Sequence, residues 1–236
     1  MNRARSVALA LAAVTCAFLS VASADEHPVA AGSNRIPAGA WHSLLKGDAA
    51  ATWHGWTSAG LPAGWQVKDG ILSKDGKVED LITQQSFGNF ELELEWKIGK
   101  GGNSGIFYRG VQQYDHIYWT APEYQLLDDV NSPDGQDRLT AAGSVYGIYP
   151  APAGVVKPFG EWNSTRIVVN GTHIEHWLNG RKVVEYEIQG TDWKAKVAAS
   201  KFAPYRYGMA EKGVIGIQGD HSGALALRRI RIRELP

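Results

Sequence analysis

The sequence has almost no cysteine. Its 236 residues contain one, Cys16, which lies in a segment that we expect to be removed. The mature protein would then have no disulfide, no thiol nucleophile and no thiolate metal site, so the core alone must stabilise its fold. Lipid attachment at Cys16 is the alternative, although the preceding residues 13–15 (AVT) match a lipoprotein signal poorly.

Net charge and long hydrophobic runs are also missing. The chain carries 24 Lys and Arg against 24 Asp and Glu, and its basic residues are scattered along the sequence. Nucleic acids and anionic membrane surfaces are bound by basic patches, so we expect neither as a partner. Beyond the N-terminus no stretch reaches the ~18 apolar residues that cross a bilayer, so we expect no membrane span.

The motifs that define many enzyme classes are absent as well. The sequence has no phosphate-binding loop, dinucleotide fingerprint, G-x-S-x-G elbow, H-E-x-x-H helix or EF-hand loop. These absences exclude most of the classes that such motifs identify. What remains is a set of polar residues in or beside predicted strands.

The first residues are typical of a secretory signal peptide. Arg3 and Arg5 precede an apolar run over residues 7–21, and residues 22–24 (ASA) form the small-x-small pattern that signal peptidase cleaves. We therefore expect a signal peptide over 1–24, a flexible leader over 25–40 and one domain over 41–236. Such a protein is exported to the periplasm or out of the cell.

Short apolar segments between turn residues predict an all-β fold. Phe90–Ile98 is the clearest strand, because apolar residues alternate with Glu91, Glu93, Glu95 and Lys97. Asn-Gly pairs predict tight turns in a meander, and helical periodicity is weak outside 193–200. The further strands that we expect are 165–169, 173–178, 182–188, 214–218 and 225–235. This pattern favours a β-sandwich or barrel of antiparallel strands.

Two segments place polar groups where an apolar sandwich does not need them. The glycine-rich residues 101–110 (GGNSGIFYRG) allow a close backbone approach to a ligand and carry Arg109, although a hairpin with a surface arginine explains them equally well. In the predicted strand over 122–129, Glu123 and Gln125 share one face about 7 Å apart. That spacing suits binding of sugar hydroxyls or, for Glu123, proton transfer; a solvated edge strand is the alternative.

Two histidines and the aromatic residues offer further candidates. His176 shares a predicted face with Ile174 and Leu178, so a buried structural histidine is the alternative to a catalytic or metal-binding one. Asp220 and His221 lie together in a glycine-flanked turn and form either an oriented base, part of a metal site, or only a turn. Most of the nine Trp and nine Tyr belong in a core, but the rest suit stacking on pyranose rings.

Seven segments in order resemble the 3-keto-disaccharide hydrolase family. They are residues 101–110 (GGNSGIFYRG), 122–128 (PEYQLLD), 143–150 (GSVYGIYP), 157–163 (KPFGEWN), 176–180 (HWLNG), 197–203 (VAASKFA) and 215–222 (IGIQGDHS). The resemblance runs from about Trp41 to residues 231–235. It implies a concanavalin A-like jelly roll of two antiparallel sheets. It also implies an exported enzyme acting on glycosides whose C3 hydroxyl has been oxidised to a ketone.

The polar positions that match the family pattern are Glu95, Arg109, Glu123, Gln125, His176, Asp220 and His221. We expect Glu123, His176, Arg109 and His221 to be catalytic. The residues that we expect to bind the substrate are Glu95, Asn103, Tyr108, Gln125, Tyr146, Lys157, Asn179, Gln218 and Asp220. Many family members read Gln-Asp-His-Gly where this chain has an additional glycine, Gly219, so the positions of Asp220 and His221 relative to a groove depend on that insertion.

A 3-keto sugar is cleaved most simply by elimination. The ketone acidifies the C2 hydrogen, so a base removes it, the aglycone leaves C1 and water adds back. His176 or Glu123 is the expected base, Arg109 or a divalent cation the enolate stabiliser, and His221 the proton donor. Calcium is the first expectation for such a cation, although no dedicated loop is present.

Two other functions fit the same sequence features. A laminarinase-like hydrolase of unoxidised glucans would use Glu93 and Glu95, but ~7 Å between neighbours on one strand face exceeds the spacing of a retaining pair. A lectin-like binding module without catalysis is the second, because the same sandwich serves both functions.

Overall fold

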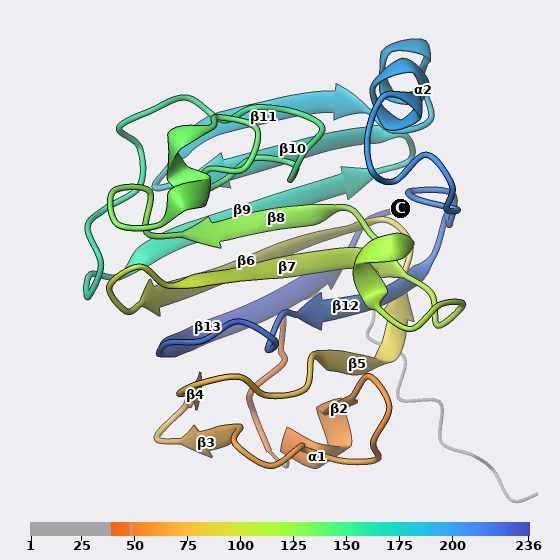
Figure 1. Cartoon of the computed structure of the whole chain (residues 1–236). Helices are drawn as coiled ribbons and strands as arrows, with labels where there is room; N and C mark the ends of the chain where they lie inside the picture. The colour runs from red at the N-terminus through yellow and green to blue at the C-terminus, as the bar shows by residue number, and fades with distance from the viewer. Residues whose placement is uncertain (1–38, 48) are drawn as a thin grey trace, which may run out of the picture. The chain divides into compact units, whose positions relative to one another are not determined.

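The computed structural model describes residues 39–47 and 49–236. In this range the chain forms two antiparallel β-sheets, as predicted (Figure 1). The predicted signal peptide, residues 1–24, and almost all of the predicted leader, residues 25–40, lie outside the described residues. Within them, no helix is long and apolar enough to cross a membrane.

The larger sheet has eight strands. Its order is β11-β10-β9-β6-β13-β4-β3, and β1 pairs with β13 off this path. The strands are β1 (His42–Ser43), β3 (Gln66–Lys68), β4 (Ile71–Lys74), β6 (Phe90–Ile98), β9 (Asn163–Asn170), β10 (His173–Leu178), β11 (Arg181–Glu187) and β13 (Leu225–Glu234).

The smaller sheet has five strands in the order β2-β5-β12-β7-β8. They are β2 (Trp53–Gly55), β5 (Leu81–Phe87), β7 (Asn103–Gly110), β8 (Glu123–Leu127) and β12 (Gly213–Ile217). Helical segments are short: α1 (Ala49–Thr52), α2 (Thr191–Ala198) and the 3₁₀ turns η1 (Ile117–Trp119) and η2 (Pro133–Gln136).

The alternating patterns located the strands well. β6 has the predicted bounds, and the predicted meander is formed by β9, β10 and β11 through the turns at Asn170 and Asn179. Within the described residues α2 is the one sizeable helix. It begins two residues before the expected start and has Asp192 in its first turn, where an acidic side chain interacts favourably with the helix dipole.

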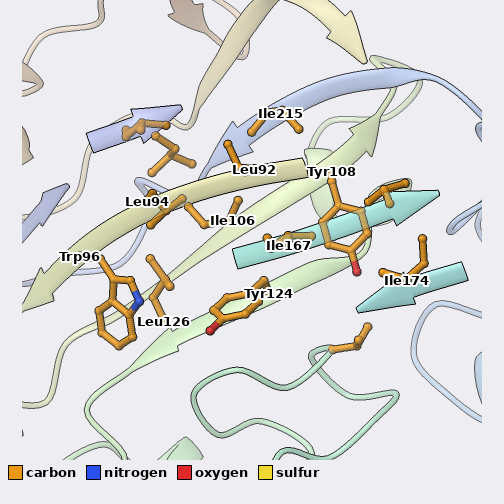
Figure 2. Packing of buried hydrophobic residues seen from close by; sticks show 14 of the residues in the cluster. Leu92, Leu94, Trp96, Ile106, Tyr108, Tyr124, Leu126, Ile167, Ile174 and Ile215 are labelled. Atoms are coloured by element: carbon orange, nitrogen blue, oxygen red, sulfur yellow. The ribbon is translucent and has the colours of Figure 1, made fainter. Parts of the chain in front are cut away.

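Apolar residues from both sheets form one core between them (Figure 2). Leu92 and Trp96 of β6 are fully buried, as are Ile106 and Tyr108 of β7 and Tyr124 of β8. Each such side chain contributes about 1.5–3 kcal/mol by leaving water. Alternate residues of β7 and β8 therefore face away from this core, and they include Asn103, Glu123 and Gln125 of the candidate site.

Candidate active site

The outer face of the five-stranded sheet holds a cavity of about 210 Å³. In the β7–β8 pair, Gly105 is opposite Gln125 and Phe107 is opposite Glu123, and opposed residues share a face. This face is the one turned away from Tyr124 and the core. The cavity is lined by Asn103, Tyr118, Glu123, Gln125, Asp134, Tyr146, Lys201, Gln218, Asp220 and His221.

Glu123 is the buried acid of the cavity, with only 6% of its surface exposed. Burial raises its pKa to about 8, and the nearby Lys201 ammonium only partly opposes this rise. Gly105 makes room for the carboxyl group, because a Cβ there would lie 2.0 Å from Glu123 Oε1. The glycine-rich segment thus admits a carboxyl group whose pKa suits proton transfer near neutral pH.

Several buried polar atoms at the cavity lack a hydrogen-bond partner within the described residues. They are both amide atoms of Gln125 and one side-chain oxygen each of Asn103, Gln218 and Asp220. A buried polar atom without a partner costs about 1–3 kcal/mol, and most buried polar groups in proteins have one. Their gathering at one cavity indicates a site for a ligand rich in hydroxyl groups.

Lys201 provides positive charge at the cavity. Its Nζ lies 4.6 Å from the ring centroid of Tyr146, 5.8 Å from that of Tyr118 and 5.1 Å from that of Phe202. Such cation–π contacts hold an exposed lysine in one region. The ammonium group can therefore stabilise an oxygen that becomes negative next to Glu123.

Two buried charged residues fix the turn that carries Asp220 and His221. Asp80 Oδ1 accepts the Gly219 N–H at 2.7 Å, and Lys74 Nζ donates to the His221 carbonyl at 2.6 Å. Both side chains are almost fully buried. Burial raises the pKa of Asp80 to about 6 and lowers that of Lys74.

The additional glycine of this turn is explained by its surroundings. A Cβ on Gly219 would lie 2.5 Å from the Glu79 carbonyl oxygen and 2.8 Å from that of Val78, so only glycine fits. With Gly219 in place, Asp220 and His221 both line the cavity, and His221 Nε2 lies 3.7 Å from Asp220 Oδ1.

The structure places His176 and Tyr108 in the core and not at the cavity. His176 is fully buried between Gly143 O, 3.0 Å from Nδ1, and the Tyr108 hydroxyl, 2.9 Å from Nε2. Burial lowers the pKa of His176 to about 4, so the ring is neutral at ordinary pH. The Tyr108 hydroxyl also bonds that of Tyr186 at 2.7 Å. These contacts support a buried structural role for His176, which was the alternative to a catalytic or metal-binding one.

Arg109 also lies apart from the cavity residues. Its backbone is left-handed, with φ of 54°, which breaks the alternation that would place it beside Gly105 and Phe107. The guanidinium donates to Gly88 O at 3.1 Å and to Asn89 Oδ1 at 3.3 Å. Arg109 therefore fixes the β5–β6 turn.

Glu93 and Glu95 lie on the outer face of the larger sheet, bound to arginines of β13. Arg231 bonds Glu93, while Arg228 and Arg229 bond Glu95 at 2.6 and 2.7 Å. Although partial burial opposes it, these hydrogen bonds lower the pKa of Glu95. An ion-paired carboxylate of low pKa is a poor general acid, which argues against Glu95 as the acid of a laminarinase-like pair.

Lys157 and Asn179 hold the chain around β9 and make no contact with the cavity. Lys157 Nζ donates to the Trp162 carbonyl at 2.9 Å. The Asn179 amide donates to Val155 O and Asn163 Oδ1, both at 2.8 Å. These hydrogen bonds stabilise the loops and turns on either side of β9.

The structure adds three residues to the candidate site: Tyr118, Asp134 and Lys201. Lys201 lies in the segment 197–203 that carried part of the resemblance, so that segment was its only signal. Tyr118 and Asp134 reach the cavity from the turns η1 and η2, which show no periodic pattern. Of the predicted residues, the cavity collects Asn103, Glu123, Gln125, Tyr146, Gln218, Asp220 and His221.

One group within the described residues could hold a metal ion. His173, Glu175 and Glu185 on β10 and β11 each offer a ligand atom within 4.8 Å of the others. Lys182 Nζ lies 3.3 Å from Glu175 Oε1 and 2.5 Å from Glu185 Oε2, so a cation already neutralises part of this charge. None of the four lines the cavity.

Comparison with known proteins supplies independent findings. A sequence model described as a 3-keto-alpha-glucoside-1,2-lyase-like domain matches residues 40–233. A 3-keto-disaccharide hydrolase from Bacteroides thetaiotaomicron is 34% identical over 85% of this chain and 80% of its own length.

Solved structures agree with this match. Two crystal structures of candidate glycosyl hydrolases from Parabacteroides distasonis superpose with TM-scores of 0.77 and 0.67, at 30% and 31% identity. Each covers 83% of this chain, and the chain covers 94% and 100% of theirs.

Proposed function

The chain belongs to the family of 3-keto-alpha-glucoside-1,2-lyase-like domains, and we propose that its cavity cleaves 3-keto-glycosides by elimination followed by hydration. It is an enzyme that acts on glycosidic bonds. The observation that carries the finer proposal is Glu123, a buried carboxyl group with a pKa of about 8 among unpaired polar groups and beside a lysine.

Glu123 acts as the base. Its carboxylate takes the C2 proton of the bound 3-keto sugar, and the C2–H electron pair forms an enolate with the C3 ketone. No hydrogen bond from the described part of the chain offsets the burial that raises its pKa. A base of high pKa is strong, so proton removal from carbon is more favourable than it would be for an exposed glutamate.

Lys201 and the turn at 220–221 complete the reaction. The Lys201 ammonium stabilises the C3 enolate oxygen. The enolate then re-forms the C3 ketone, a C1–C2 double bond appears, and the aglycone oxygen leaves C1 with the bonding electrons and accepts a proton from His221. His221 then takes a proton from water as the water oxygen adds to C1, and C2 receives a proton from the Glu123 carboxyl group after that group has exchanged with solvent. The products are 3-ketoglucose and the free aglycone.

The polar floor of the cavity binds the keto sugar. Gln125, Gln218 and Asn103 offer amide and carbonyl atoms that have no hydrogen-bond partner among residues 39–47 and 49–236. Sugar hydroxyls satisfy both donors and acceptors. A ligand that meets these groups recovers the free energy that their burial costs in the free protein.

Comparing an oxidised with an unoxidised substrate tests this function. Purified protein is incubated with a 3-keto disaccharide and with the same disaccharide unoxidised, each with and without a chelator. Release of 3-ketoglucose from the keto substrate alone supports the elimination. Cleavage of the unoxidised disaccharide would contradict it, and loss of cleavage with chelator would add a metal ion to the reaction.

Export is part of the proposal. It rests on residues 1–24, with their two arginines, apolar run and small-x-small end. We expect the mature protein to begin near Asp25 and to lie in the periplasm or outside the cell. Mass spectrometry of the protein recovered from cell fractions tests this, and an intact N-terminus in the cytoplasm would contradict it.

A further inference from the structure

A row of five half-buried aromatic rings starts at the cavity. The ring of His116 stacks on that of Tyr118 with 4.7 Å between centroids, and Tyr118 packs edge-on against Trp119 with 4.6 Å between centroids. Trp119 stacks on Tyr205 with 4.0 Å between centroids, and Tyr114 packs edge-on against Tyr205 with 5.2 Å between centroids. We name these five residues the aromatic wall. Tyr118 also lines the cavity, so the wall and the cavity are continuous.

The wall is rigidly built. Ile117 is fully buried above Gly110 and Gly216, where added Cβ atoms would lie 2.8 and 2.6 Å from its Cδ1. This anchor fixes Tyr118 and Trp119, which are its neighbours in the turn η1. Aromatic rings that remain partly exposed leave apolar surface in contact with water, which is unfavourable. Apolar patches of this kind commonly mark binding sites.

Hydrogen bonds hold the same turn from outside. Trp56 Nε1 donates to the Asp115 carbonyl at 2.8 Å, and Trp119 Nε1 donates to Asp115 Oδ1 at 3.0 Å. The indole N–H of Trp119 is already used, and one face of its ring stacks on Tyr205. This half-buried residue can therefore offer a ligand only the ring surface that Tyr205 leaves uncovered, and no hydrogen-bond donor.

The size of the cavity requires a second binding surface. At about 210 Å³ it is smaller than the 300–1,000 Å³ typical of pockets that enclose a whole ligand. The unpaired amides at Gln125 and Gln218 suit the keto sugar itself. The leaving group of a glycoside must then lie outside the cavity, next to Tyr118 and the rest of the aromatic wall.

We propose that the aromatic wall is the leaving-group subsite and binds aglycones that present a flat ring face, either a second sugar or a phenol. This inference rests on the function proposed above. Ring faces select for shape more than for a hydroxyl pattern, so the enzyme accepts different ring-bearing leaving groups and binds them better than small aliphatic ones.

The test compares three 3-keto substrates that share the sugar and differ in the leaving group: methyl glucoside, phenyl glucoside and a disaccharide. For each, kcat/KM is measured with wild type, Trp119→Ala and the control Trp162→Ala. Trp162 is a half-buried tryptophan that contacts Lys97 and Arg228 and not the cavity. Dividing each ring-bearing value by the methyl value cancels the amount of folded protein, and comparing this ratio between variant and wild type cancels the intrinsic reactivity of each leaving group.

We expect Trp119→Ala to lower these ratios about tenfold, equivalent to the loss of one good ring contact, and Trp162→Ala to leave them as in wild type. A fall for both ring-bearing substrates supports the shared ring face, and a fall for one identifies which leaving group the wall binds. Tyr205→Ala is the second variant should Trp119→Ala not fold.

Unchanged ratios in Trp119→Ala and Tyr205→Ala would overturn the subsite while leaving the proposed function intact. If wild type cleaves none of the three keto substrates, the proposed function fails, and the subsite falls with it. The two failures are therefore distinguishable.

Discussion

Replacing Glu123 with glutamine tests stability and catalysis together. Glu123→Gln keeps the shape of the side chain and removes its titration. The folded protein holds the Glu123 proton with a pKa of about 8, against an ordinary value of 4.5. Because the folded state binds the proton more tightly, its stability falls as pH rises from about 4.5 to 8.

The size of this effect follows from the two pKa values. The penalty on the free energy of unfolding is about 1 kcal/mol at pH 5 and about 4 kcal/mol at pH 8. Titration of Glu123 should therefore lower the free energy of unfolding of wild type by about 3 kcal/mol between pH 5 and pH 8. For a domain of this size that corresponds to roughly 6–12 °C in Tm. Glu123→Gln should lack this loss.

Thermal and urea unfolding at pH 5, 6, 7 and 8 measure the difference. Glu161→Gln, at an exposed glutamate outside the cavity, is the matched control and should follow wild type. The difference between Glu123→Gln and wild type should grow with pH in favour of the variant. Parallel curves would refute the buried, high-pKa carboxyl.

The same variant should lose catalysis. Removal of a general base typically costs 10²–10⁴-fold in rate, so Glu123→Gln gains stability and loses kcat. In wild type, ionisation of Glu123 should give the pH profile of kcat/KM an ascending limb that ends near pH 8. Activity in Glu123→Gln close to wild type would exclude Glu123 as the base.

Three further variants separate site from scaffold. Gly105→Ala pushes a Cβ into the Glu123 carboxyl group and should lower kcat about 10²-fold in a folded protein; kinetics like wild type would contradict the close approach. Asp80→Ala removes the acceptor for the Gly219 N–H and should lower kcat about tenfold. Asp80→Asn keeps an acceptor oxygen and should recover activity. Equal loss in both variants would contradict positioning of the 220–221 turn through that hydrogen bond. His176→Gln should cost about 1–3 kcal/mol of stability with kcat/KM within about twofold of wild type, and a 10²-fold loss would show that His176 acts in catalysis.

Strand alternation predicted the antiparallel all-β class and part of the site, whereas the arrangement in two sheets was implied by the family resemblance. The period-two pattern of Phe90–Ile98 matches β6 because one face packs in the core and the other meets water. The same reasoning placed Glu123 and Gln125 on one face of β8, where both line the cavity. All five residues of β8 are buried, so the alternative of an edge strand with a solvated face is wrong. The alternation could not show this, because the loops that cover the strand have no periodic pattern.

The remaining parts of the site depend on tertiary structure. Tyr118 reaches the cavity because Trp56, far away in sequence, holds its turn through Asp115, and no local pattern encodes that bond. Arg109 leaves the outer face because of one left-handed residue. His176 shares a face with Ile174 and Leu178, and this alternation alone favoured the core position that the structure gives it.

Cleavage of a 3-keto disaccharide in deuterium oxide tests the central claim most directly. Deuterium at C2 of the released 3-ketoglucose is quantified by NMR at early times, with 3-ketoglucose incubated alone as the control for spontaneous exchange. Elimination and hydration predict one deuterium at C2 with wild type and no cleavage with Glu123→Gln. Cleavage that keeps the C2 hydrogen of the substrate would contradict proton removal by Glu123 and the mechanism built on it.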